Sequence, residues 1–112
     1  MARSYLGEFE LMVMLALIRL SENAYGVPIL REIEKTTKRE VAIGSVYAAL
    51  ERLERKGFVI SIVGESTAER GGRAKRYFHP TKSGMNQVRK TRQALINLWR
   101  ACQNLEEDVH ED

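Results

Sequence analysis

The chain has 112 residues, of which 44% are hydrophobic and 29% charged, a composition that fits one soluble globular domain. The net charge is only +3, but the charges are unevenly distributed. Residues 25–80 carry eleven Lys or Arg and seven Asp or Glu, residues 82–100 carry five cations and no acid, and residues 103–112 carry five acids and no cation. The basic excess in the middle of the chain favours a polyanionic partner.

Several classes of protein are excluded by what the sequence lacks. Cys102 is the single cysteine, so no disulfide forms within the chain and a reducing cytoplasm is expected. The apolar run at 11–18 is far shorter than the roughly 20 residues of a membrane span. His79, His110 and Cys102 do not have metal-ligand spacing, and no nucleophile–base arrangement stands out. We therefore expect a cytoplasmic protein that is not an enzyme and has no cofactor, metal or membrane partner.

The first predicted helix covers residues 7–19. Its apolar residues extend over more than one face, so it should lie between two partners, namely the rest of the head and the C-terminal helix of this or a second subunit. A second, short helix begins near Gly26 or Val27, with Pro28 in its first turn, where a missing N–H is tolerated.

A third helix is predicted from about Ile43 to Lys56, because apolar residues recur on one stripe at helical spacing, at Val46, Ala49, Leu50 and Leu53. Gly57 ends it, since glycine readily takes the left-handed conformation after a helix. Its other side carries Ser45, Ala48, Arg52 and Arg55, with Tyr47 on the flank. The short connection from the second helix predicts a helix-turn-helix.

The next segment reads as a β-hairpin. The β-branched run at 59–63 is followed by a polar, glycine-rich stretch at 64–74 and then by Lys75-Arg76-Tyr77-Phe78. Gly71-Gly72 lacks the full pattern of a nucleotide-binding loop and is interpreted as the hairpin tip. A helix followed by strand, basic loop and strand is the outline of a winged helix.

The last predicted helix follows Thr81, a suitable N-cap. Ile96 and Trp99 lie beside a heptad-like seam in this helix. The seam is formed by residues spaced alternately by three and four, namely Val88, Thr91, Leu95, Leu98, Cys102, Leu105 and Val109. Such a seam favours a homodimer. The predicted fold class is thus mainly α with a two-stranded β-hairpin wing, divided into a DNA-binding domain at 1–80 and a C-terminal dimerisation helix with an acidic tail at 81–112.

The sequence resembles the PadR-like transcriptional regulators, specifically the short group with one C-terminal helix. The resemblance extends from about Leu6 to Trp99 and is strongest at Tyr25-Gly26, at the segment GSVYAALERLERKG, and at RYF followed by Thr81 and Gly84. It implies a winged helix-turn-helix head, dimerisation through the first and last helices, and binding to a near-palindromic double-stranded operator, usually as a repressor.

The resemblance also implies which residues contact DNA. Ser45 and Tyr47 match the serine-x-tyrosine at the start of the recognition helix, although Tyr47 could instead support that helix against the wing. Lys75 and Arg76, together with Arg73, match the basic residues before the second wing strand, and Tyr77 matches an aromatic there. Ala42 departs from the serine or threonine common before the recognition helix. Arg52 and Arg55 are either backbone contacts or partners of surface acids.

A candidate effector pocket follows from the same resemblance. In short members that sense drugs, a tryptophan on the last helix stacks on flat aromatic compounds in a pore between subunits, which would be Trp99 here, with Phe9, Met12 and Ile96 as further lining. The alternative for all four is ordinary core or interface packing. We therefore expect a homodimeric repressor, released by a small aromatic effector. The rival hypotheses are a winged-helix protein-interaction module without DNA binding, and a small-molecule carrier.

Overall fold

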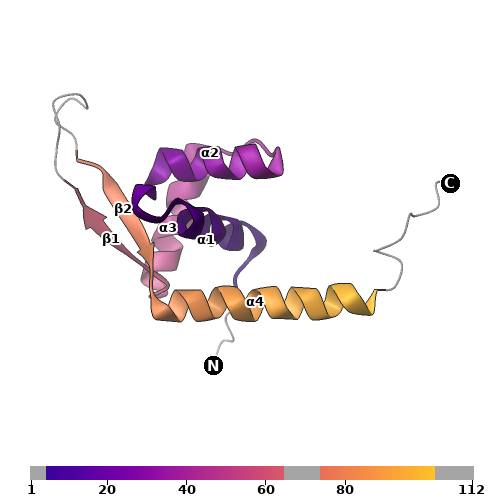
Figure 1. Cartoon of the computed structure of the whole chain (residues 1–112). Helices are drawn as coiled ribbons and strands as arrows, with labels where there is room; N and C mark the ends of the chain where they lie inside the picture. Colours follow the sequence, from indigo (N-terminus) through magenta and orange to yellow (C-terminus); the bar gives the residue numbers. More distant parts are fainter. Residues whose placement is uncertain (1–4, 65–73, 103–112) are drawn as a thin grey trace.

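The computed structural model describes residues 5–64 and 74–102, and it is mainly helical with a two-stranded antiparallel hairpin (Figure 1). In chain order its elements are α1 (Glu8–Leu20), the short 3₁₀ helix η1 (Ser21–Asn23), α2 (Gly26–Thr37), α3 (Ile43–Arg55), β1 (Val59–Val63), β2 (Arg76–Pro80) and α4 (Lys82–Ala101). This arrangement is a winged helix with a long C-terminal helix, and it confirms the predicted fold class.

The core is built around α1, which contacts α2, α3, β2 and α4. Met14 and Leu17 on this helix are completely buried. They pack in one cluster with Ile29 of α2 and with Leu50 and Leu53 of α3, which are equally buried. Burying a side chain of this size contributes about 1.5–3 kcal/mol. The prediction that α1 lies between two partners is confirmed, with α4 of the same chain on its second side.

Local sequence signals set the element ends as expected. Gly57 follows α3 with φ of 80°, the left-handed conformation that ends a helix. The Thr81 hydroxyl accepts a hydrogen bond of 3.0 Å from the Gly84 N–H at the start of α4. Ala42, which precedes α3, provides no side-chain cap. The limits of α1 and α3 and the starts of α2 and α4 agree with the predicted ones to within about one residue. However, α4 ends at Ala101, and Cys102, predicted to lie on the helical seam, has an extended backbone.

The wing strands pair with Val59 opposite Pro80 and Val63 opposite Arg76. Val59 and Phe78 are buried against the head, whereas Ile60 and Ile62 are exposed. The Phe78 N–H donates a 2.8 Å hydrogen bond to the Ala24 carbonyl, which fixes the hairpin beside the start of α2. The predicted hairpin tip, including Arg73, lies outside the described residues.

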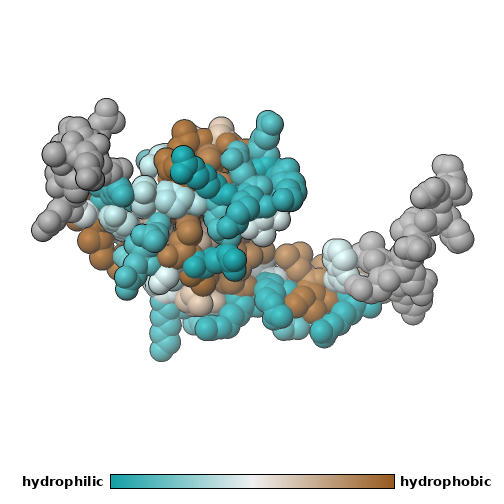
Figure 2. Space-filling model, turned by 45° about the horizontal axis from the view of Figure 1, so that its top comes forward, coloured by the Kyte–Doolittle hydropathy of each residue, from teal (hydrophilic) through white to brown (hydrophobic). Residues whose placement is uncertain are grey.

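Helix α4 extends past the head (Figure 1). At its start, Val88 is buried, and the Thr91 hydroxyl accepts a 3.2 Å hydrogen bond from the Leu6 N–H. Further along, Leu95 is 54% exposed and Leu98 68% exposed, and apolar atoms lie at the surface of this part of the helix (Figure 2). The last two seam positions, Leu105 and Val109, are outside the described residues. None of the described helices has the length and apolar character needed to cross a bilayer.

Candidate nucleic-acid interface

Near the start of α3, the side chains that face away from the core are small and weakly polar. Ser45 and Ala48 are exposed, and the Ser45 N–H donates a 3.0 Å hydrogen bond to the Ala42 carbonyl in the first turn. Arg55, near the other end of the helix, is also exposed. The predicted contact Ser45 is thus available at the helix start, where recognition helices meet base edges.

Tyr47 connects α3 to the start of α2. The end of its ring lies directly over Gly26, so closely that a Cβ at position 26 would overlap the Tyr47 hydroxyl. The side chain is nevertheless 43% exposed. The observed contact of Tyr47 is therefore with α2, whereas the alternative predicted from the sequence is support against the wing, and a DNA contact of Tyr47 stays a prediction.

The basic residues at the start of the second strand meet an aromatic pair at the loop end of the paired strands, where Val63 lies opposite Arg76. We call Lys75, Arg76 and Tyr77 the wing root. The Lys75 ammonium lies 4.3 Å from the centre of the Tyr25 ring, and the Tyr77 ring meets the Tyr25 ring edge-on at 5.4 Å between centroids. Arg76 is exposed. A cation held over an aromatic face is oriented without being neutralised.

Tyr25 is the residue that sequence reasoning did not assign to the interface. It lies at the N-cap of α2, immediately before the glycine on which Tyr47 packs, and it contacts two of the three wing-root residues. The only signal in the sequence is the Tyr25-Gly26 pair itself. Tyr25 therefore contacts the wing root and adjoins in sequence the glycine that Tyr47 of α3 contacts.

Among the described residues, Arg52 pairs with an acid on α1. Its Nε is 3.3 Å from Oε2 of Glu10 on α1, and the Lys56 ammonium is 3.0 Å from the same oxygen. Burial raises the pKa of Glu10, but the Gly7 N–H, Lys56 and Arg52 outweigh it, so the pKa is lowered below 4.5. Of the alternatives for Arg52, this geometry matches the ion pair with an acid, and a DNA contact for it stays a prediction.

The four residues of the candidate effector pocket do not line one cavity in the described chain. Phe9 borders a hollow beside Ser45 with Arg39, whose guanidinium lies 5.9 Å from the Phe9 ring centre. Ile96 borders a separate apolar groove between α1 and α4 with Leu11, Leu15 and Leu95. Trp99 is 52% exposed on the part of α4 that extends past the head.

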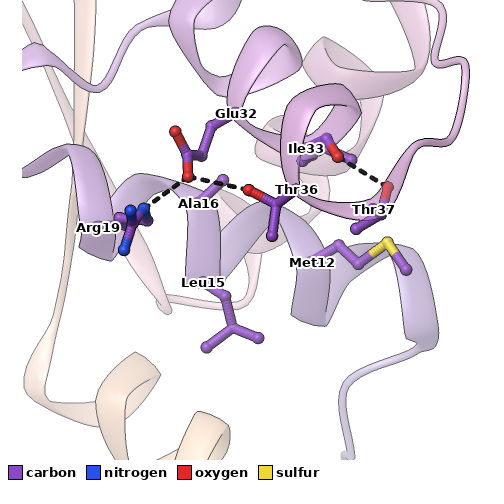
Figure 3. Close-up of a pocket in the computed structure, with 8 residues that line it drawn as sticks. All are labelled: Met12, Leu15, Ala16, Arg19, Glu32, Ile33, Thr36 and Thr37. Carbon is purple, nitrogen blue, oxygen red and sulfur yellow. Dashed lines mark hydrogen bonds and ion pairs between the residues drawn. The ribbon is translucent and has the colours of Figure 1, made fainter.

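Met12 lines a third cavity, of about 130 Å³, between α1 and α2 (Figure 3). Its one acid is Glu32, whose carboxylate is bound by Arg19 at 2.6 Å and accepts a 3.1 Å hydrogen bond from the Thr36 hydroxyl. Burial raises the pKa of Glu32, but Thr36, Lys35 and Arg19 outweigh this effect and lower it. The carboxylate thus serves to join α1 to α2, and the remaining lining is mostly apolar.

Among residues 5–64 and 74–102, no cluster of three or more His, Cys, Asp or Glu has an arrangement able to hold a metal ion.

Solved structures of other proteins share this fold. A PadR-like transcriptional regulator from Bacillus cereus is 22% identical, with a TM-score of 0.70, over 90% of this chain and 93% of that one. A PadR family transcription regulator from Clostridium difficile is 19% identical, with a TM-score of 0.70, over 90% and 100%. A transcriptional regulator from Clostridium thermocellum is 20% identical, with a TM-score of 0.72, over 88% and 89%. No curated protein matches the sequence.

These likenesses show a shared fold, and the family follows from the sequence itself. The model of the transcriptional regulator PadR-like family matches residues 14–90, which extend from the middle of α1 to the middle of α4 and include α3 and the wing root. The chain therefore belongs to the PadR-like family of transcriptional regulators.

Proposed function

We propose that this protein is a homodimeric repressor that binds a near-palindromic operator, with the start of α3 in the major groove and the wing root on the phosphate backbone. The observation that carries the proposal is that Tyr47 of α3 packs on Gly26, while the adjacent Tyr25 contacts the wing root. Ser45 on α3 and Arg76 in the wing root are exposed. Hydroxyl groups and cations on one surface are the groups that bind phosphate oxygens, and such contacts position a protein on DNA.

The dimer is supported by the α4 seam, of which the first part is buried within the chain and the next part is exposed. Val88 and Thr91 are buried within the chain, whereas Leu95 and Leu98 at the following seam positions are mostly exposed, next to the apolar groove that contains Leu11. A second copy would cover the apolar surface of both helices at once. Its two-fold axis would place two half-sites about one DNA turn, ~10 bp, or a multiple of it apart.

The proposal includes an aromatic effector that binds at Trp99 between subunits and releases DNA. Its support is the half-exposed indole on the same part of α4 as Leu95 and Leu98. Within one chain, Phe9 and Met12 lie in other hollows, so Ile96 and Leu95 are better candidates for the remaining lining.

The test is binding to DNA upstream of the protein's own gene, by footprinting and by titration at several salt concentrations. Charge reversal of the wing root, Lys75→Glu with Arg76→Glu, should weaken binding to all sequences. It should also reduce the slope of log affinity against log salt by about 2, because each lost phosphate contact removes about 0.9.

A matched control reverses two exposed cations of α4, Arg89→Glu with Arg100→Glu, which changes the net charge equally but lies outside the proposed surface. Unchanged affinity and slope in the wing-root variant would remove Lys75 and Arg76 from the interface. Absence of binding to any DNA at low salt would instead favour the rival, an interaction module acting through α4 and the acidic tail.

A further inference from the structure

The first two turns of α3 have an unusual outward surface. Gly44 and Ala48 occupy its centre by helical spacing, with Ile43 on one edge and Ser45 on the other. Ile43 is 41% exposed. Residues 43–50 contain no Arg, Lys, Asn, Gln or His, the residues that read guanine and adenine by paired hydrogen bonds in the major groove.

No contact among the described residues explains why position 44 is a glycine. A Cβ built at this position meets no atom within 4 Å, and its backbone does not require a left-handed conformation. Glycine in a helix lowers stability by up to about 1 kcal/mol relative to alanine. Because none of residues 5–64 and 74–102 would be crowded by a Cβ at position 44, the space in front of Gly44 is available for close approach by a ligand.

We infer that the start of α3 reads its operator mainly through the 5-methyl groups of thymine, with Ile43 and Ala48 as the apolar contacts and Gly44 allowing the bases to come close. This inference rests on the proposed function and names the DNA feature that is recognised. Apolar side chains that meet a thymine methyl are an established form of direct readout, and the methyl is the one apolar group exposed in the major groove. Ser45 supplies the single hydroxyl of the first turn.

The experiment uses the full-length protein and a random-sequence duplex library. The most enriched duplex is then remade with each thymine replaced singly by uracil, which removes only the 5-methyl group. We expect at least one thymine in each half-site at which this replacement lowers affinity about fourfold, the value of one buried methyl group. In Ile43→Ala, that difference between thymine and uracil should disappear at one position.

Two further variants separate recognition from folding. Ile60→Ala is the matched control, because Ile60 is similarly exposed but lies on β1, and this variant should keep the preference for thymine. Gly44→Ala should fold at least as stably as the wild type and bind the selected duplex at least tenfold more weakly.

Three other outcomes would overturn the inference, and the last of them would overturn the proposed function as well. An enriched duplex that binds equally well with uracil at every position would overturn the inference while leaving DNA binding intact. Equal losses for Ile43→Ala on thymine and uracil duplexes would also overturn it. Failure to enrich any sequence, with no salt-dependent binding to DNA, would overturn the proposed function and the inference together.

Discussion

Glu10 is a buried carboxylate at the junction of α1 and α3. Its side chain is 9% exposed, and its carboxylate is bound by Arg52, Lys56 and the Gly7 N–H. Removing one member of a buried charged group leaves the others without their partner. At this site the consequence falls on two helices, because Glu10 lies on α1 and both cations lie at the end of α3.

Replacing Glu10 by Gln should lower the free energy of unfolding by about 1–3 kcal/mol at pH 7, since hydrogen bonds to a charged group are lost. The folded-state pKa of Glu10 lies below the ordinary value of a glutamate. Its contribution is therefore present at pH values above the unfolded-state pKa and is lost as the pH falls through the lower, folded-state pKa. Urea unfolding at a series of pH values should show the variant and the wild type converging in acid.

Glu8→Gln is the control for this prediction. Glu8 also pairs with an arginine, Arg39 at 3.1 Å, but its side chain is 71% exposed. An exposed ion pair contributes less than about 1 kcal/mol. Equal stability of Glu10→Gln and wild type at pH 7 would show that the buried cluster does not stabilise the junction.

At the scale of elements, the orientation of α4 is fixed where it leaves the wing. Gly84, in its first turn, lies on the backbone of Phe58, and a Cβ there would overlap the Phe58 carbonyl oxygen. The same carbonyl accepts a 3.0 Å hydrogen bond from the Thr81 N–H, while the Thr81 hydroxyl donates a 2.7 Å bond to the Gly57 carbonyl. The segment between α3 and β1 and the start of α4 are thus joined through backbone groups and the Thr81 hydroxyl.

Gly84→Ala should therefore destabilise the protein by about 1–3 kcal/mol, the usual cost of overpacking, because backbone cannot move aside as a flexible side chain does. Thermal unfolding measures this loss of stability. Ser83→Ala, at the exposed neighbouring position, is the control and should change stability by less than about 0.5 kcal/mol. A Gly84→Ala protein as stable as the control would show that α4 is not held closely on Phe58.

At the scale of the whole molecule, the apolar surface of α4 and α1 decides the assembly. Leu98→Glu places a charge in the proposed dimer interface and should weaken dimerisation at least tenfold, as measured by sedimentation equilibrium. Because Leu98 is 68% exposed in the chain, the fold of each protomer should survive. Trp99 is the single tryptophan, so its fluorescence should shift to longer wavelength as the dimer separates.

The control for the dimer is Gln93→Glu, a charge on the opposite side of α4 by helical spacing. It should leave the dimer intact. If Leu98→Glu remained dimeric, the seam would lie outside the interface, and the division of the chain into a head at 1–80 and a dimerisation helix at 81–112 would lose its functional basis.

The sequence by itself determined the elements, because the signals that form them are local. Apolar residues at helical spacing marked the buried face of α3, Gly57 and Thr81 marked helix ends, and the β-branched run at 59–63 coincided with β1. The family pattern likewise depends on short motifs. Each of these signals needs only neighbours within a few residues, so periodicity and turn chemistry are sufficient to read it.

The tertiary structure decided which distant side chains meet. Arg52 pairs with Glu10, 42 residues away, and Tyr25 at the start of α2 contacts Lys75 and Tyr77 at the start of β2. Phe9 and Met12 lie apart from Ile96 because α1 turns different sides to α2 and α4. No local pattern encodes these pairings, since they depend on how packed helices cross and on where the wing folds back beside α2.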